Sequence, residues 1–361
     1  MSPPGRPKGE YRSAQHEGTL ESLPLLITMG DAVGIGPECI VRAFLAGGAE
    51  RAVVIGDVAV MRRAAAWLPE RAVIAVIESP ADLDAVPAGC VPVIEPAGLP
   101  AGLAALPWGQ VDARCGAAAA RCIEVAVGLV QSRAAAAIVT APIHKEAFAA
   151  TGIKFPGHTE MLQALAAGRG AAAAAPVRMM LANDELRVVL VTIHMALRQA
   201  IEALDFDLVL QTIRIADRAA RGWGLATPPR IAVAGLNPHA GEGGLFGSEE
   251  QVFIAPAVQA ARAEGIDASG PFAPDTVFMR ARNAHQHRGE FDLVIAMTHD
   301  HGLIPVKYLG VEQGVNVTLG LPFVRTSPDH GTAFDIAGRG MADASSLLAA
   351  IRWARRAVAA P

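Results

Sequence analysis

Leu25–Leu45 reads LLITMGDAVGIGPECIVRAFL and contains a strand, a loop and a helix signal in succession. Its first five residues, Leu25–Met29, form a short uninterrupted apolar run, which is typical of a β-strand buried on both faces of a sheet. A loop containing Gly30 and Asp31 follows, and Pro37–Leu45 then has a helical pattern. A buried strand, a polar loop and a helix in this order are typical of an α/β protein.

The same pattern recurs along the chain. Further apolar runs predict strands at Ala52–Ile55, Ala72–Ile77, Ala136–Thr140, Leu186–Thr192, Ile231–Leu236 and Leu293–Met297. Helical patterns lie between them or after them, at Asp112–Arg133, Asp207–Arg221, Glu249–Glu264 and Ala344–Ala359. The alternation predicts an α/β fold with a largely parallel sheet. We expect residues 23–361 to form a single unit of two interleaved α/β lobes with a cleft between them and lobe boundaries near residues 140–150 and 320.

Composition excludes several classes of function. The chain has 361 residues, 52% of them hydrophobic, and a net charge of −4 without a basic stripe, so we expect no nucleic-acid surface. The cysteines show no CxxC spacing, which predicts reduced, buried thiols and a cytoplasmic location; they are Cys39, Cys90, Cys115 and Cys122. Residues 1–22 lack the apolar core of a signal peptide and are expected to be a disordered tail. No run is apolar for long enough to cross a membrane.

Polar residues gather just after the predicted strands. They are Gly30–Asp31, His144–Lys145, His194, Asn237–His239 and His299–Asp300. Ligands of open α/β sheets bind outside the carboxyl ends of strands, so these loops are expected at one edge of the sheet. A lone histidine is more often a hydrogen-bonded structural residue, but three neutral imidazoles, from His194, His239 and His299, can hold a Zn²⁺-type ion and leave positions open for substrate. Their spacing is too long for a local metal motif.

A second set of residues predicts an anion pocket. Lys307, Asn316 and Arg325 combine two cations with an amide, and both cations stand in apolar stretches, where an unpaired charge is costly. Surface charge is the alternative interpretation. His158 and Thr159 lie where a loop enters a helix, whose first turn could face an anion, and a plain capped helix is the alternative there.

A glycine-rich loop precedes the last helix. Asp329–Gly340 reads DHGTAFDIAGRG, and its small side chains would let the backbone approach a nucleotide closely. The Rossmann fingerprint GxGxxG is missing, because its closest match, Gly34–Gly36, has no third glycine where one is needed. We therefore reject a Rossmann dinucleotide site.

Taken together, these strings resemble the 4-hydroxythreonine-4-phosphate dehydrogenase family of the vitamin B6 pathway, which includes phospho-threonate and phospho-erythronate dehydrogenase relatives. The resemblance runs from about Leu25 to about Ala350, and this many motifs in order exclude chance. The matching strings are Thr28–Glu38, Val139–Lys145, Gly157–Glu160, Met180–Val188, Leu236–Gly244, Asp275–Phe278, His299–Asp300 and Gly314–Ser327.

The resemblance implies the fold of the isocitrate and isopropylmalate dehydrogenases and a site shared by the two chains of a homodimer. A divalent metal, Zn²⁺ or else Mg²⁺, Mn²⁺ or Co²⁺, would be bound by His194, His239 and His299. Substrate-binding positions would be His158, Thr159, Lys307, Asn316 and Arg325, and Asp275 matches an acidic residue of the same site. NAD would lie on the loop that contains Gly331, Thr332, Asp335, Ile336 and Gly338.

The implied activity is that of an NAD-dependent and metal-dependent oxidoreductase of pyridoxine biosynthesis. It would oxidise and decarboxylate 4-phosphohydroxy-L-threonine to 3-amino-2-oxopropyl phosphate, with Lys307 or Asp275 as the catalytic base. The alternative substrates are 4-phospho-D-threonate and 4-phospho-D-erythronate, and an aromatic dihydrodiol dicarboxylate ranks lower. A phosphate acyltransferase and a non-catalytic metabolite-binding protein are alternatives of other classes.

The chain departs from the family pattern near the predicted site. Met29 and Ala32 stand where proline is usual, Thr298 replaces a usual tyrosine and His301 replaces a usual glutamine. Thr298 and His301 flank a predicted metal ligand, so these departures bear on which substrate the chain accepts.

Overall fold

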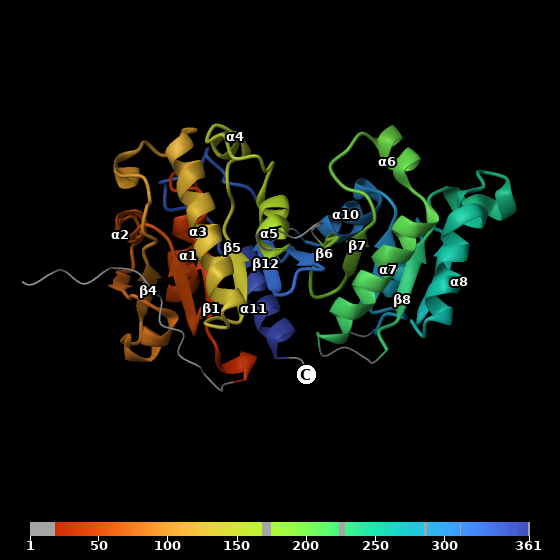
Figure 1. Ribbon diagram of the computed structural model, residues 1–361, viewed down its shortest axis with the longest axis horizontal. Coiled ribbons are helices and arrows are strands. Elements are labelled where there is room, and N and C mark those ends of the chain that lie inside the picture. Colours follow the sequence, from red (N-terminus) through yellow and green to blue (C-terminus); the bar gives the residue numbers. More distant parts are fainter. Residues whose placement is uncertain (1–18, 168–174, 224–227, 285–286, 311, 360–361) are drawn as a thin grey trace, which may run out of the picture.

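The computed structural model describes residues 19–167, 175–223, 228–284, 287–310 and 312–359. In this part of the chain one sheet of 12 strands runs through the molecule in the order β3-β4-β2-β1-β5-β12-β11-β6-β7-β10-β8-β9. Helices pack along the sheet, with α1, α2 and α3 near one end and α7 and α8 near the other (Figure 1). The α/β class predicted from the sequence is confirmed.

The elements have the following bounds. The strands are β1 (Leu25–Thr28), β2 (Ala52–Ile55), β3 (Val73–Val76), β4 (Cys90–Ile94), β5 (Ala137–Thr140), β6 (Arg178–Ala182), β7 (Arg187–Leu190), β8 (Ile231–Ala234), β9 (Ala268–Phe272), β10 (Leu293–Ala296), β11 (Val315–Leu319) and β12 (Val324–Pro328). The α-helices are α1 (Gly36–Leu45), α2 (Val58–Ala66), α3 (Ala113–Gln131), α4 (Lys145–Ala149), α5 (His158–Ala167), α6 (Leu197–Ala203), α7 (Phe206–Arg221), α8 (Ala255–Ala263), α9 (Val277–Ala281), α10 (His299–Tyr308) and α11 (Ser345–Val358).

The two faces of the sheet belong to different hydrophobic cores. One face packs against α1, α7, α8 and α11 in a core that includes Ile40 and Trp353. The other face packs against α3 and α5 through residues such as Leu162, and farther along the sheet against α9 and α10 through residues such as Leu303. Most strands are therefore covered on both sides, which explains their uninterrupted apolar sequences.

Four strands in the middle of the sheet change its direction. β12 pairs parallel with β5 but antiparallel with β11, and β6 pairs antiparallel with both β11 and β7. The other pairings are parallel, as predicted. The antiparallel pairs reverse the hydrogen-bond ladder, yet α4, which follows β5, and α6, which follows β7, lie on the same side of the molecule (Figure 1). The charge of Lys145 in α4 also contributes to the lowered pKa of His194, which follows β7. Convergence of all the polar loops at one edge stays a prediction.

Sequence patterns located most elements that have a strong hydrophobic signal. All seven predicted strands are present, and four of the five predicted helices end within two residues of the expected bounds. The exception is Glu249–Glu264, which begins as a π-helix over Glu250–Ile254 before α8 follows. β3 also differs from the expectation, because it is an edge strand with two exposed side chains, Val73 and Val76.

The remaining expectations about the whole chain have different outcomes. Most of the tail predicted for residues 1–22 lies outside the described residues, while Leu20–Ser22 forms a 3-10 helix. The division into two lobes stays a prediction. Cys39, Cys115 and Cys122 are buried free thiols. Among the described helices, none has the length and apolar character needed to span a membrane.

Two glycines of α3 provide a test of the packing between α3 and α4. A Cβ atom at Gly116 would lie 2.2 Å from the carbonyl oxygen of Ala147 in α4, whereas a Cβ atom at Gly128 would meet nothing within 4 Å. We expect Gly116→Ala to lower the free energy of unfolding by about 1–3 kcal/mol, because backbone must move to relieve the overlap. Gly128→Ala should raise it by up to about 1 kcal/mol through helix propensity. Urea unfolding of both variants measures the difference, and equal stabilities would contradict this packing.

Candidate active site

Two of the three predicted metal ligands lie close together in one chain. His194 follows β7 and His299 begins α10 directly after β10, and these two strands are neighbours in the sheet. The centroids of the two imidazole rings are 5.5 Å apart. Zn–N bonds of ~2.0–2.1 Å at tetrahedral angles place two ligating rings about 5 Å apart, so this pair fits one ion.

His194 and His299 open onto a shared cavity of about 470 Å³. His301 also lines it, and its Nδ1 is buried without a hydrogen-bond partner among the described residues. Partial burial, followed by the nearby charge of Lys145, lowers the pKa of His194. A lowered pKa favours the neutral imidazole, which is the form that binds metal. Lys145 belongs to α4, so α4 lies near enough to this cavity for its charge to be felt.

The third histidine, His239, is presented by an unusual turn. Residues His239–Gly243 all have positive φ, so the backbone follows a left-handed turn that is unfavourable for residues other than glycine. Buried Glu250 holds the turn, because its carboxylate accepts hydrogen bonds from the backbone of Leu236 and from both the backbone and side chain of Asn237. Burial opposes the ionised carboxylate, but these hydrogen bonds outweigh it and lower the pKa of Glu250.

The three histidines do not form a complete metal site in one chain. Within the described ranges, no three histidine, cysteine or carboxylate side chains converge as a metal-binding group. His239 is exposed and contacts Phe246, with 6.3 Å between the ring centroids. The predicted ligand set therefore stays a prediction.

Arg325 is a buried cation at the middle of the sheet. It lies in β12, only 3% of its surface is exposed, and burial lowers its pKa to about 10. Its Nη1 donates a hydrogen bond to Thr318 Oγ1 at 2.9 Å and its Nη2 donates one to Thr140 Oγ1 at 2.6 Å. Nε is buried without a hydrogen-bond partner, and no carboxylate of the described residues forms an ion pair with Arg325.

His158 adjoins this guanidinium from the first position of α5. Burial and the charge of Arg325 hold the pKa of His158 well below its usual range, so the imidazole is neutral. Its Nε2 is also buried and has no partner among the described residues. Two neighbouring buried nitrogens without partners are uncommon in folded proteins, and an anion would accept hydrogen bonds from both.

Lys307 differs from the sequence-based expectation. It lies in α10, its side chain is 40% exposed, and its Nζ donates to Asp329 Oδ2 at 2.5 Å. The expectation of an unpaired charge is therefore wrong at Lys307, because Lys307 pairs with the carboxylate of Asp329, which follows β12. Its helix buries Leu303 and Val306 but leaves Ile304 and Tyr308 exposed. Arg325, in contrast, is buried and forms no ion pair with a carboxylate of the described residues, as expected from its apolar stretch of sequence.

The other predicted substrate residues fall into two groups. Asn316 lies in β11 two positions before Thr318, so both side chains project from the same face of the sheet as Arg325. Thr159 is half-buried at the start of α5. Asp275 is exposed in the turn before α9, and no described hydrogen bond or ion pair joins it to the other site residues.

The predicted cofactor loop packs against the glycine-rich loop after β1. The backbone N–H of Ile35 donates to the carbonyl of Thr332 at 3.0 Å, and a Cβ atom at Gly34 would lie 3.1 Å from Thr332. Phe334 stacks on His144, with 4.6 Å between the ring centroids. Any ligand along this loop would therefore also lie beside Gly34.

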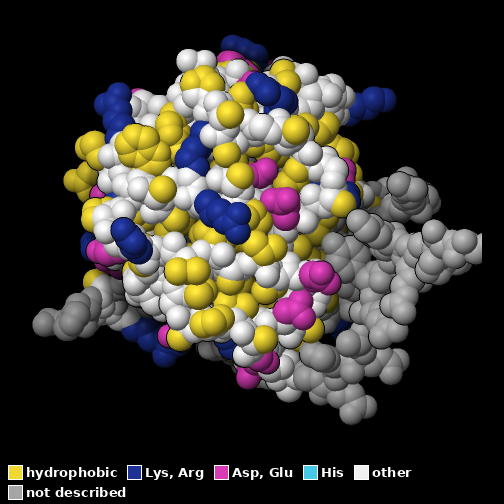
Figure 2. Space-filling model, turned by 90° about the vertical axis from the view of Figure 1, so that its left-hand side faces the viewer, with side chains coloured by type: hydrophobic (Ala, Val, Ile, Leu, Met, Phe, Trp, Pro, Cys, Tyr) yellow, Lys and Arg dark blue, Asp and Glu magenta, His cyan; other side chains and the backbone are white. Residues whose placement is uncertain are grey.

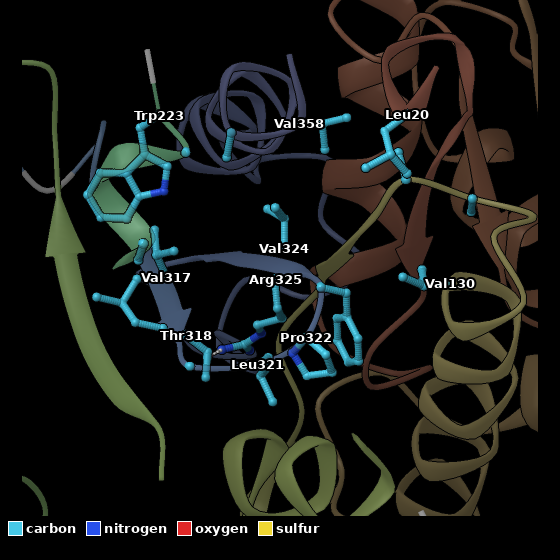
Figure 3. Close-up of a pocket in the computed structure, with 18 of the residues that line it drawn as sticks. Leu20, Val130, Trp223, Val317, Thr318, Leu321, Pro322, Val324, Arg325 and Val358 are labelled. Carbon is cyan, nitrogen blue, oxygen red and sulfur yellow. Dashed lines mark hydrogen bonds between the residues drawn. The ribbon is translucent and has the colours of Figure 1, made fainter. Parts of the chain in front are cut away.

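A cavity of about 620 Å³ lies elsewhere, at the amino ends of β5 and β12. Its walls are mostly apolar and include Trp223, Val358 and Leu20 (Figure 3). Arg325 lines it, but its guanidinium points toward Thr318 rather than toward Trp223 (Figure 3). Because its walls are mostly apolar, this larger cavity is a weaker candidate for the active site than the cavity that His194 and His299 line. On the end of the molecule that Figure 2 shows, no histidine is visible among the described residues.

Sequence reasoning missed the groups that complete this arrangement. Thr140, Thr318 and Asp329 were not recognised as partners of the predicted cations. The only signal for Thr140 and Thr318 was their presence in matching family strings, because hydrogen bonding to Arg325 depends on strand register that the sequence does not display.

The family model described as "PdxA: Pyridoxal phosphate biosynthetic protein PdxA" matches residues 48–354 of the chain. A 4-hydroxythreonine-4-phosphate dehydrogenase from Beijerinckia indica is 54% identical over 92% of this chain and 94% of its own length. A D-threonate 4-phosphate dehydrogenase from Cupriavidus necator is 48% identical over 91% of this chain and 96% of its own length.

Solved structures give the same result. The crystal structure of a 4-hydroxythreonine-4-phosphate dehydrogenase from Klebsiella pneumoniae matches with a TM-score of 0.82 and 43% identity, covering 93% of this chain and 98% of that one. A terephthalate 1,2-cis-dihydrodiol dehydrogenase from Burkholderia xenovorans matches less well, with a TM-score of 0.65 and 29% identity over 92% and 98% of the two chains. With its motifs, fold and family match in agreement, the chain belongs to the PdxA family of pyridoxal phosphate biosynthetic proteins.

Proposed function

We propose that the chain is an NAD-dependent and divalent-metal-dependent dehydrogenase that oxidises and decarboxylates a phosphorylated hydroxy acid. The first choice of substrate is 4-phosphohydroxy-L-threonine, with 3-amino-2-oxopropyl phosphate as the product. 4-Phospho-D-threonate or 4-phospho-D-erythronate is the second choice, because a D-threonate 4-phosphate dehydrogenase matches the chain at 48% identity, close to the 54% of a 4-hydroxythreonine-4-phosphate dehydrogenase.

The observation that carries the proposal is the buried charge of Arg325. A buried cation without a carboxylate partner is costly, and a substrate phosphate supplies the missing negative charge. His158 Nε2 and Arg325 Nε, both buried without partners, give this phosphate two donors. Asn316 projects from the same face of the sheet as Arg325, and Thr159 follows His158 in α5. Lys307 is paired with Asp329.

The donor set of the histidines fits a metal. Neutral imidazoles are typical Zn²⁺ ligands, and the spacing of His194 and His299 suits two positions on one ion. A metal held there would supply Lewis-acid chemistry for the oxidation and for the loss of CO₂. The chain's own residues position the phosphate and accept the hydroxyl proton, and Lys307 and Asp275 both remain candidates for that base.

A second copy of the chain is the proposed source of the remaining ligands. Large hydrophobic side chains are exposed around the histidine cavity and on the neighbouring elements, which is typical of an interface. They are Met195, Leu197, Ile201, Leu245, Phe246, Val252, Met279, Ile304 and Tyr308. The proposed assembly is a homodimer whose two active sites each use both chains.

The substrate is tested by comparing phosphorylated and unphosphorylated forms of each candidate with NAD⁺, following NADH. We expect a strong preference for the phosphorylated form in the wild type. Arg325→Ala should lose much of it, and Arg325→Lys should weaken binding too, because lysine lacks the planar fork. Loss of one charge-assisted contact corresponds to about one to two decades in affinity. Equal use of both forms by the wild type would overturn the phosphate assignment, and absence of NADH formation with every candidate would favour the acyltransferase or binding-protein alternatives.

The metal is tested by removing its ligands. We expect His194→Ala, His239→Ala and His299→Ala each to lose bound metal and most activity while keeping the fold. His287→Ala is a matched control, because His287 is exposed and precedes β10, at the opposite end of that strand from His299. Metal analysis and circular dichroism are measured together with turnover. Full metal content in any of the three variants would remove that histidine from the ligand set.

The shared site is tested by a charge placed in the proposed interface. Ile304→Asp, at a side chain 65% exposed in α10, should produce monomers and abolish activity. Val73→Asp, at a side chain 61% exposed on the edge strand β3, should leave both the dimer and the activity unchanged. Analytical ultracentrifugation combined with turnover decides the outcome, and a fully active monomer would exclude a site built from two chains.

A further inference from the structure

The partners of the Arg325 guanidinium are both neutral hydroxyl groups. Thr140 and Thr318 accept hydrogen bonds from its two terminal nitrogens, and both threonines are buried. Figure 3 shows Arg325 and Thr318 joined at the edge of the larger cavity. Elsewhere in the described chain, several arginines pair with carboxylates, as Arg230 does with Asp292. Arg325 is therefore fixed in place by neutral acceptors; the charge of Glu160 opposes the lowering of its pKa by burial, but no ion pair joins the two side chains.

Strand register brings these groups together. Arg325 lies opposite Ile138 in β5, so Thr140 is two residues farther along and on the same face. Thr318 lies directly across from Arg325, because Val317 pairs with Thr326 in the antiparallel β11–β12 ladder. The two hydroxyls thus hold the guanidinium from two different neighbouring strands. A guanidinium has five N–H donors, so donors remain for a ligand after these two bonds form.

We propose that Thr140 and Thr318 are positioning residues, which hold the Arg325 guanidinium with neutral acceptors so that its full charge is available to a substrate phosphate. This inference rests on the proposed function. A carboxylate at either position would satisfy the same donors, but it would also neutralise the cation and repel a phosphate dianion. Hydroxyl groups fix the orientation of the planar fork without that competition.

Replacement of each hydroxyl by a methyl group tests the positioning role. Thr140→Val and Thr318→Val keep the approximate side-chain volume but remove the acceptor. We expect each to raise KM for the phosphorylated substrate about tenfold, with a smaller change in kcat. Thr140→Ser and Thr318→Ser restore the acceptor and should restore KM. Retention of the wild-type KM in both valine variants would overturn the proposal.

Arg178 provides an internal control for the structural effect of such a change. It is also a buried arginine held by neutral acceptors, since its Nε donates to Thr212 Oγ1 at 2.7 Å and its Nη2 donates to Gln211. Thr212→Val therefore removes a hydroxyl from a comparable arginine in β6 that the proposal does not place in the site. It should lower thermal stability without raising KM. An equal rise of KM in Thr212→Val and Thr318→Val would show a general packing effect and contradict positioning.

The charge argument has a separate test at Thr318. Thr318→Asp and Thr318→Asn are nearly equal in size, and only the first gives Arg325 an ionised partner. Binding of inorganic phosphate, measured by calorimetry, should be abolished in the aspartate variant and only weakened in the asparagine variant. Equal phosphate affinity in the two variants would overturn the charge argument, whether or not the valine variants fold.

These outcomes separate the inference from the proposed function. If the wild type neither binds phosphate nor prefers phosphorylated substrates, the proposed function fails. If the wild type does both and the threonine variants behave like it, the proposed function stands and the positioning role of Thr140 and Thr318 is refuted.

Discussion

The parallel pairing of β12 with β5 is the constraint on which the rest of the structure depends. Residues 141–323 lie between these strands, so the pairing closes a loop that contains about half of the chain. The entropy cost of closing a loop grows only slowly with its length, and burial of the apolar strands on both faces offsets it. The same pairing places Arg325 beside Thr140, 185 positions away in the sequence. β12 also pairs with β11 on its other side, which joins the two ends of the 12-stranded sheet.

That placement has opposite consequences for stability and for binding. Burial lowers the pKa of Arg325 to about 10, which still leaves the guanidinium charged at neutral pH. The cost of desolvating this charge is only partly offset by hydrogen bonds to two hydroxyls. Because this cost is only partly offset, the binding of an anionic ligand is favoured: the ligand supplies a negative charge with which Arg325 can pair. The left-handed turn at His239, held by buried Glu250, follows the same logic at the proposed metal site, where an unfavourable backbone conformation is maintained by surrounding contacts.

The sequence predicted those features that depend on local pattern. Runs such as Ala137–Thr140 and helices such as Phe206–Arg221 have strong periodicity, and both were located within a residue or two. β11 and β12 were missed, because the predicted strands were uninterrupted apolar runs, whereas polar residues interrupt β11 at Asn316 and Thr318 and occupy Arg325–Ser327 in β12. The reversal of sheet direction and the Lys307–Asp329 ion pair were missed for another reason: each depends on contacts between distant segments. The histidines and the anion-pocket residues were predicted from their positions in the sequence, and the family resemblance implied their roles; the convergence of the three histidines is still a prediction.

The phosphate pocket does not decide between the two leading substrates. 4-Phosphohydroxy-L-threonine and 4-phospho-D-threonate share the phosphate and the carboxylate. The first has an amino group where the second has a hydroxyl group. An amine is a cation at neutral pH, so a site selects it by offering acceptors and rejects it by leaving its donors unpaired. Under the proposed function, Arg325 with its two threonines contacts only the shared phosphate. Discrimination between the two substrates must then depend on residues that do not contact the phosphate, near the cavity of about 470 Å³ that Thr298 and His301 line together with His194. Strand register fixes the groups around Arg325, so under the proposed function the residues that line the histidine cavity are the ones that discriminate between an amine and a hydroxyl group.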